Sequence, residues 1–67
     1  MKDLRTYVSR RVIIETDTTI VEGVLARTTA TTIELEHAAE LKPGAAPEPI
    51  DGIVVVPSAR VAVVQVL

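Results

Sequence analysis

The side chains best suited to chemistry lie close together near the middle of the chain. His37, the only histidine, directly follows Glu36 and stands three residues before Glu40. An imidazole beside a carboxylate can act as a general base. The chain offers no cysteine, no second histidine and no glycine-rich phosphate loop to complete such a site. We therefore interpret His37 as structural or solvent-exposed and predict no catalytic residue.

Glu34 and Glu36 form a second candidate, because carboxylates two residues apart on a strand share one face. Paired carboxylates occur in glycosidases and in sites for hard cations. A solvated sheet face explains the same spacing, and a zinc site built mostly from carboxylates would be unusual. The sequence predicts no enzyme activity, no metal site and no cofactor.

Arg60 stands between two aliphatic segments and is a candidate for binding rather than for catalysis. Repeated around an assembly, its guanidinium could attract phosphate. It could also form an ion pair with Asp51 or Glu48 of a neighbouring copy, which is the simpler interpretation.

Threonine and arginine supply the remaining binding candidates. Thr29 and Thr32 carry hydroxyls that can contact bases or phosphates, although threonine is also common in strands because of its shape. Arg10 and Arg11, with Arg5 nearby, could form a basic rim for nucleic acid or for an acidic partner. The solvated end of a helix is the alternative explanation for these arginines.

Length and composition limit the molecule that must position these residues. The chain has 67 residues, eleven of them valine and six isoleucine, with one tyrosine and no phenylalanine, tryptophan or cysteine. A single domain of this size is marginally stable alone, and disulfides are excluded. Oligomerisation is the remaining support. The net charge of −2 is unfavourable for nucleic-acid binding, which normally shows a basic excess.

The hydrophobic pattern predicts a short helix followed by strands. Asp3 can cap a helix over 3–9 that presents Leu4, Tyr7 and Val8 on one face. From Arg11 the period changes to two, and Gly23 marks a bend or a close backbone approach. We expect one all-β domain over 1–67, with strands over 11–16, 20–27, 31–37, 50–56 and 60–67 and an exposed proline-containing loop over 40–49.

The last two predicted strands are apolar on both faces. A strand of this kind must be covered on both sides, and one short helix cannot do so. A neighbouring copy is the simplest cover, and a head-to-tail pairing that closes gives a ring. We predict a homo-oligomeric ring of five to seven copies, with a dimer or trimer as the alternative. The predicted interface comprises Ile53, Val54, Val55, Val56, Val61, Val63, Val64 and Val66.

The order of elements and several short motifs resemble the Sm-like (Sm/Lsm/Hfq) superfamily. Leu4 to Gly23 (LRTYVSRRVIIETDTTIVEG) is similar to the family's opening, and Gly23-Val24-Leu25 matches its G-x-L. Leu35-Glu36-His37-Ala38 resembles the end of the family's third strand. Gly52 to Val56 and Val61 to Val64 resemble its second motif. The resemblance implies a small five-stranded, strongly bent, SH3-like (Sm-fold) barrel with a short N-terminal helix.

The residues that bind uridine in this family have no counterpart here. Such members carry Asp and Asn around an aromatic residue or Met, and later Arg-Gly or Tyr-Lys-His. The corresponding stretches read Thr28-Thr29-Ala30-Thr31-Thr32 and Pro57-Ser58-Ala59. Base stacking on an aromatic side chain is worth about 1–3 kcal/mol, and none is available there. The resemblance therefore implies a ring without the usual uridine pocket.

Three functions stay open at this point. The chain could form a ring associated with single-stranded RNA, a non-catalytic scaffold ring that binds a protein, or a monomeric SH3-like module that binds a peptide. The sequence contains no apolar run of transmembrane length and no signal-peptide pattern. We expect a cytoplasmic protein that does not contact membranes.

Overall fold

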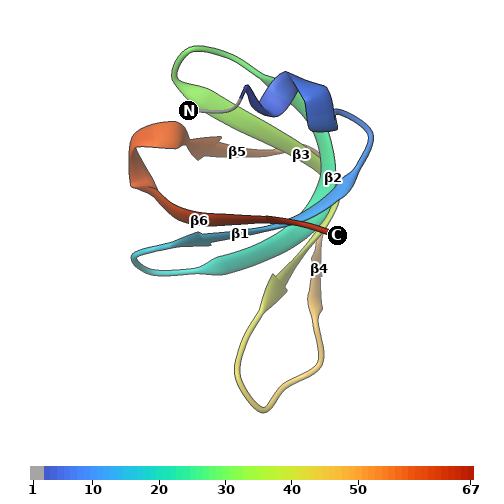
Figure 1. The fold of residues 1–67 in the computed structure, drawn as a ribbon. Coiled ribbons are helices and arrows are strands. Elements are labelled where there is room, and N and C mark those ends of the chain that lie inside the picture. Colours follow the sequence, from blue (N-terminus) through green and yellow to red (C-terminus); the bar gives the residue numbers. More distant parts are fainter. Residues whose placement is uncertain (1–2) are drawn as a thin grey trace.

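The fold is a single curled antiparallel sheet preceded by one helical turn (Figure 1). The computed structural model describes residues 3–67. The elements are η1 (Leu4–Tyr7), β1 (Arg11–Thr16), β2 (Ile20–Thr28), β3 (Thr32–Leu41), β4 (Glu48–Ile50), β5 (Val54–Pro57), η2 (Ser58–Arg60) and β6 (Val61–Val66).

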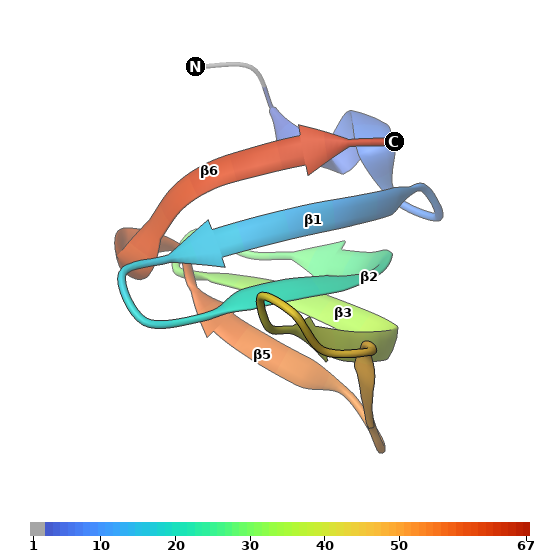
Figure 2. The same ribbon diagram turned by 90° about the horizontal axis from the view of Figure 1, so that it is seen from below.

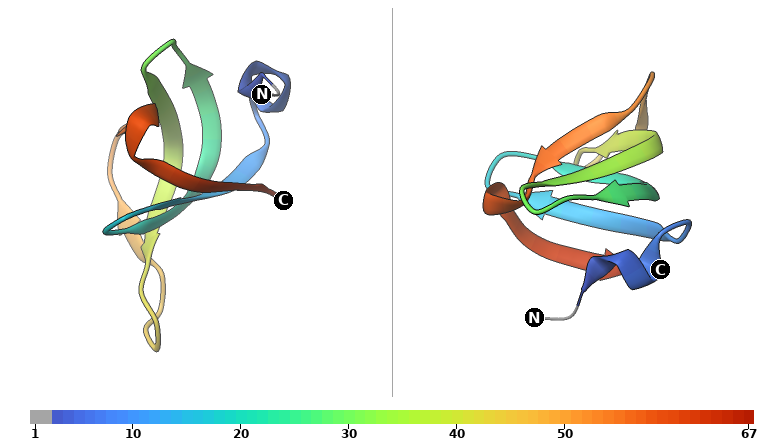
Figure 3. Two further views of the ribbon diagram at one scale, coloured as in Figure 1. Left: turned by 60° about the vertical axis from the view of Figure 1, so that its left-hand side comes forward. Right: turned by 90° about the horizontal axis from the view of Figure 1, so that it is seen from above.

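The strand order places β6 at one edge of the sheet and the β4–β5 segment at the other. The path runs β4-β3-β2-β1-β6, and β5 also pairs with β3. Every pairing is antiparallel. The sheet curls so that η2 connects the end of β5 directly to the start of β6 (Figures 2 and 3). The two edges are thus neighbours along the chain but lie at opposite ends of the strand order.

The fourth predicted strand, over 50–56, is in fact two strands on the same side of β3. β4 pairs with Ala38–Glu40 and β5 with Thr32–Leu35. Between these pairings, residues 51–53, centred on Gly52 (φ 81°), lie opposite residues 36–37 of β3, which include His37 (φ 51°). One strand segment thus has three residues where the other has two. This extra residue is a bulge, which bends both strands. The single-strand expectation was wrong because strand propensity does not report such a break.

The predicted loop over 40–49 is shorter than expected. β3 continues past His37 to Leu41, and β4 begins at Glu48, so residues 42–47 alone connect the two strands. The β3–β4 hairpin projects beyond the body of the sheet (Figure 1). Lys42 lies 3.4 Å from the Glu48 carboxylate and 3.9 Å from the Glu40 carboxylate, which links the two strands at the base of the turn.

The core is aliphatic and lies on the concave face of the sheet. Its buried members are Val12, Ile14, Val21, Leu25, Ile33, Leu35, Ala38 and Val56. The alternation in β1 and in the first half of β3 follows the predicted pattern. His37 in β3 is exposed, although the two-residue period that buries Ile33 and Leu35 would place it on their face. His37 leaves that face because the bulge interrupts the two-residue period.

The N-terminal helix is shorter than the predicted 3–9 and has 3-10 geometry. Asp3 caps it as expected, because its carboxylate accepts a hydrogen bond from the Arg5 N–H. Leu4 and Tyr7 pack on the core, whereas Val8 is exposed, contrary to expectation. The helix ends at Tyr7 since Val8 has an extended backbone and Ser9 has a φ of 74°. No helix within residues 3–67 is long and apolar enough to cross a membrane.

Candidate functional site: free strand edges and polar turns

Two hairpin turns of the sheet are built in the same way from threonine. In the β1–β2 turn, the Thr16 hydroxyl accepts hydrogen bonds from the N–H groups of Thr18 (3.3 Å) and Thr19 (3.1 Å). The Thr16 N–H donates to the Thr19 carbonyl, and their hydroxyls lie 3.1 Å apart. These bonds close a tight turn without the glycine that primed turns prefer.

The β2–β3 turn repeats this arrangement and uses the predicted binding threonines. The Thr29 hydroxyl accepts from the N–H groups of Thr31 (3.2 Å) and Thr32 (3.0 Å) and lies 2.6 Å from the Thr32 hydroxyl. The Thr29 N–H donates to the Thr32 carbonyl. The hydroxyls of Thr29 and Thr32 therefore serve to close the turn.

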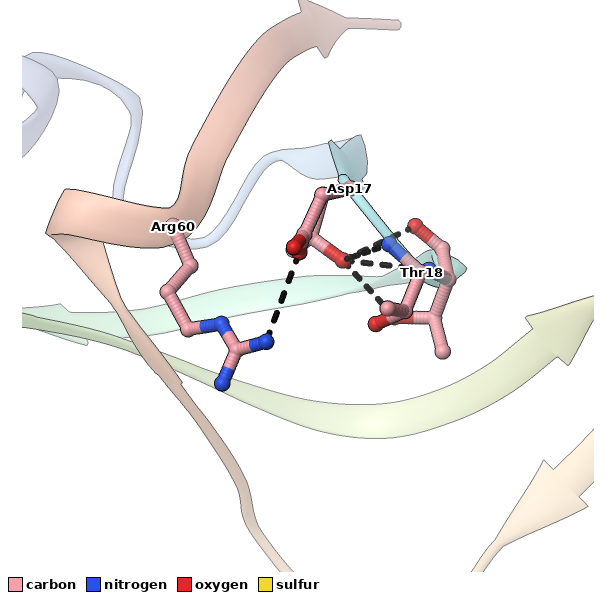
Figure 4. Close-up of polar contacts among 5 residues, drawn as sticks. Asp17, Thr18 and Arg60 are labelled. Atoms are coloured by element: carbon pink, nitrogen blue, oxygen red, sulfur yellow. Dashed lines mark hydrogen bonds and ion pairs between the residues drawn. The ribbon is translucent and has the colours of Figure 1, made fainter.

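Arg60 pairs within its own chain. Its Nη2 lies 3.5 Å from Oδ1 of Asp17, at the tip of the β1–β2 turn (Figure 4). The two side chains are 57% and 67% exposed, so solvent screens the attraction between them. Within the single chain the partner of Arg60 is Asp17, and the pairing with Asp51 or Glu48 of a neighbouring copy stays a prediction. No local pattern predicts this contact, because the β1–β2 turn and η2 come together only in the folded sheet.

The three N-terminal arginines have different partners. Arg10 donates from Nη2 to the Leu67 carbonyl at 2.7 Å, which ties β6 to the start of β1. Nη1 of Arg11 lies 3.6 Å from the Glu22 carboxylate on the neighbouring strand. Arg5 donates from Nε to Asp3 at 2.7 Å, and this hydrogen bond lowers the pKa of the Asp3 carboxyl and raises that of Arg5. Each arginine is thus already engaged.

A hollow of about 460 Å³ lies beside the β2–β3 turn, between η1 and η2. Asp3, Thr29 and Ser58 supply its polar lining, and Leu4 and Ile33 supply apolar lining. None of its lining residues is aromatic or basic. The hollow consequently offers no aromatic surface for base stacking. Arg5 lies beside it, lining an adjoining hollow that shares Asp3, Thr28, Thr29 and Ala30.

The histidine and acidic side chains of the described residues form no cluster typical of metal binding. No group of three His, Cys, Asp or Glu side chains among residues 3–67 could hold a metal ion. His37 is exposed at the bulge of β3, while Glu34 and Glu36 are partly exposed.

The most distinctive surface consists of two strand edges with exposed aliphatic side chains. The outer edges of β5 and β6, here called the free edges, pair with no other strand among residues 3–67. Around them Ile53, Val55, Val63 and Leu67 are between 48% and 54% exposed. Unpaired edges with apolar side chains invite pairing with another chain.

The predicted interface residues divide into two groups in the single chain. Val56 is buried, and Val54, Val61, Val64 and Val66 pack partly buried against the core. Ile53, Val55 and Val63 point outward and are exposed. Leu67 is equally exposed but was not in the predicted interface. Leu67 could have been included in the predicted interface, because it is the last residue of the apolar segment that forms β6.

Hydrogen bonds elsewhere in the sheet reveal which backbone groups face the free edge of β5. The Ser58 N–H donates to the Thr31 carbonyl on β3. In an antiparallel ladder alternate residues face opposite neighbours, so Val56 and Val54 also face β3. The N–H and C=O of Val55 therefore face outward.

The same reasoning applies to the free edge of β6. The Leu67 N–H donates to the Arg11 carbonyl, and Gln65 and Val63 pair with Ile13 and Glu15 in the same register. These residues direct their backbone groups to β1. Val64 and Val66 consequently offer an N–H and a C=O each to the free edge.

Comparison with known proteins identifies the fold. No protein-family model and no curated protein sequence matches the chain. Among solved structures, the heptameric archaeal Sm protein is similar, with a TM-score of 0.83 and 21% identity over 96% of this chain and 94% of that one. A chain of the NatC complex bound to CoA matches with a TM-score of 0.78 and 22% identity, covering 97% and 84% of the two chains. The chain has an Sm-like, all-β fold.

Proposed function

We propose that this Sm-like chain is the subunit of a homo-oligomeric ring, in which the free edge of β5 pairs with the free edge of β6 of the next copy. The observation that carries the proposal is the presence of two unpaired edges with outward backbone groups and exposed aliphatic side chains on one small subunit. Because the two edges differ, each copy can pair with two neighbours, and such a heterologous contact generates a closed ring or a filament.

The energies are adequate for such an assembly. Fully burying one valine, leucine or isoleucine side chain contributes about 1.5–3 kcal/mol. Ile53, Val55, Val63 and Leu67 are each about half exposed, so each adds about 1 kcal/mol when covered. The backbone hydrogen bonds of a new strand pair add to this gain. The similar archaeal Sm protein is heptameric, which supports a copy number between five and seven.

The decisive experiment removes one outward N–H from the free edge of β5. We expect Val55→Pro to abolish assembly, because the variant cannot donate to a neighbour while its pairing with β3 is retained. Val55→Thr is the matched control, since it keeps the N–H and the branched shape. Native mass spectrometry measures the copy number against the 7.2 kDa single chain. A wild-type protein that stays monomeric at high micromolar concentration contradicts the proposal and favours a monomeric SH3-like module.

The function of the ring is that of a non-catalytic scaffold for a protein partner. The Arg60–Asp17 pair, the mutually bonded hydroxyls of Thr29 and Thr32 and the absence of aromatic residues from the hollow beside them support this choice. Capture of a protein partner by the assembled wild type, but not by Val55→Pro, is the expected result.

Single-stranded RNA is the second candidate ligand. Arg60 is the exposed cation in the turn that joins the two free edges, so a ring would repeat it once per copy. To contact phosphate, Arg60 must exchange its contact with Asp17 for the ligand. Arg10 and Arg11 each have a partner in the same chain. They would contact phosphate only by giving up that partner.

A further inference from the structure

Two of the four prolines occupy equivalent positions on the strand segment that forms the β5 edge of the sheet. Pro49 lies in β4 opposite Ala39, and Pro57 ends β5 opposite Thr32. Proline lacks the backbone N–H, so its effect depends on whether the missing donor would face β3 or the free edge.

At Pro57 the missing donor faces the free edge. The Thr32 carbonyl accepts from the Thr29 N–H, so Thr32 directs its backbone groups to β2. In an antiparallel pair, the backbone groups of two opposite residues either both point toward each other or both point away. Because those of Thr32 point away from β5, those of its partner Pro57 point away from β3. The ladder between β3 and β5 loses no hydrogen bond to this proline.

At Pro49 the same result follows from a different bond. The Thr16 N–H donates to the Thr19 carbonyl, so the backbone groups of Thr19 face β1. Because alternate residues face opposite neighbours, the backbone groups of Glu22, three residues later, face β3. Glu22 pairs with Ala39, which therefore faces β2. Pro49, opposite Ala39, faces the free edge. Neither Pro49 nor Pro57 can donate a backbone N–H to the free edge. Within β5, Val55 is therefore the residue whose N–H can donate to a neighbouring chain.

We infer that the prolines fix the register of assembly, with Val55 of one copy opposite Val64 of the next in an antiparallel pair. The inference rests on the proposed function and specifies its contact. Val55 and Val64 both direct an N–H and a C=O to their free edges, and in this register each donates to the other. Antiparallel pairing is chosen because every pairing within the sheet is antiparallel.

Neighbouring registers are less favourable for stated reasons. If Val55 lies opposite Val66, Val64 lies opposite Pro57, and the Val64 carbonyl receives no donor. If Val55 lies opposite Ala62, Val66 lies opposite Asp51, which is outside β5 and charged. In the inferred register Pro57 lies opposite Ala62, an exposed residue that the shift in the β1–β6 register leaves without a partner in β1.

The two strands also match in charge and in shape. Neither β5 (Val54–Pro57) nor β6 (Val61–Val66) carries an ionisable side chain, so no charge is desolvated between them. Directly opposite residues of an antiparallel pair place their side chains on the same face. Val55, about half exposed, would thus cover the exposed part of Val64.

The absence of cysteine from the chain makes the register measurable by disulfide cross-linking. Hydrogen-bonded antiparallel partners have Cα atoms about 5.5 Å apart, within the range of about 4.4–6.8 Å that a disulfide spans. We expect Val55→Cys/Val64→Cys to form covalent oligomers under mild oxidation. Val55→Cys/Val66→Cys and Val55→Cys/Ala62→Cys are the shifted controls and should cross-link at least tenfold more slowly.

The role of proline is tested by adding Pro57→Ala to the Val55→Cys/Val66→Cys chain. Restoring the donor at residue 57 should raise the yield of this shifted cross-link severalfold. Circular dichroism of each reduced variant verifies folding, and a fourth pair, Ile53→Cys/Val66→Cys, reports the inferred register from the other end.

The outcomes separate this inference from the proposed function. Oligomers that cross-link preferentially through residue 62 or 66 with residue 55 overturn the register, while the ring proposal stands. Preferred cross-linking through Val64 that Pro57→Ala leaves unchanged overturns the role of the proline. Absence of oligomers in the wild type, measured by native mass spectrometry, overturns the ring itself.

Discussion

Gly23 on β2 and Ala38 on β3 approach each other so closely that a side chain on Gly23 would be crowded. A Cβ placed on Gly23 would lie 3.1 Å from the Ala38 Cβ and 3.2 Å from the Glu36 carbonyl oxygen. Both residues are buried, at the point where the β2–β3 register shifts. The close approach lets β2 and β3 bend together around the core.

Gly23→Ala should therefore destabilise the fold, although alanine usually stabilises a strand relative to glycine. The added methyl forces the backbone apart, and overpacking of this kind costs about 1–3 kcal/mol. Denaturant unfolding of the monomeric Val55→Pro background measures the effect without assembly. Adding Ala38→Gly should restore part of the loss, since the Glu36 carbonyl still limits the space. A Gly23→Ala chain as stable as its parent would show that the contact is not restrictive.

His37 should be replaceable by glycine or asparagine but not by valine. Its φ of 51° lies in the left-handed region, which costs an ordinary residue about 1–2 kcal/mol and a β-branched one more. The imidazole is exposed, so its removal loses little packing. We expect His37→Gly to unfold at equal or higher denaturant concentration and His37→Val at a clearly lower one. Equal stability of the valine and asparagine variants would contradict the backbone argument.

Thr16→Ala and Thr29→Ala should cause similar losses of stability, because each hydroxyl accepts two backbone N–H bonds in the same arrangement. Loss of a comparable hydroxyl cap costs about 0.5–2 kcal/mol. Thr16→Ser and Thr29→Ser keep the hydroxyl and serve as controls that should retain most of the stability. Chemical denaturation measures the free energy of unfolding of each variant. A serine variant that is destabilised as much as its alanine counterpart would rule out the hydrogen-bonding role.

Asp17→Asn and Arg60→Gln should change RNA affinity in opposite directions if Arg60 contacts phosphate. Removing the Asp17 charge frees the guanidinium and should strengthen binding of a short single-stranded oligonucleotide at low salt. Arg60→Gln should weaken it and reduce the slope of log affinity against log salt concentration. Fluorescence anisotropy measures both. If neither variant nor the wild type retains the oligonucleotide, the scaffold function alone stands.

The sequence predicted the concave face of the sheet better than its bends. Ile33 and Leu35 alternate with polar residues, and Val12 and Ile14 follow the same two-residue period on either side of the partly buried Ile13; burial follows that period directly. The break at Gly52 and the bulge at His37 were missed, because each depends on how two distant segments align. Val54 to Val56 is apolar throughout, so the hydrophobic pattern alone could not locate the end of a strand.

The candidate site was predictable where it depends on composition and not where it depends on contacts. The run of valine in β5 and β6 indicated two strands in need of a cover, and the exposed Val55 and Val63 agree with that reading. The Asp17–Arg60 pair joins residues 43 positions apart, which no local pattern reports. The turn-closing hydrogen bonds of Thr29 and Thr32 depend on the folded backbone and were not predicted, while their proposed contact with nucleic acid stays a prediction.

The bend in β3 divides this strand between two partners of unequal stability. Its first half pairs with β5 beside buried Ile33 and Leu35, whereas its second half pairs with β4, where Ala38 is the one buried residue of the hairpin. Segments with few buried contacts open locally without global unfolding. Amide protons of the β3–β4 hairpin should thus exchange with solvent well before those of β1 and β2, so the hairpin would behave as a separately melting arm attached to a rigid barrel.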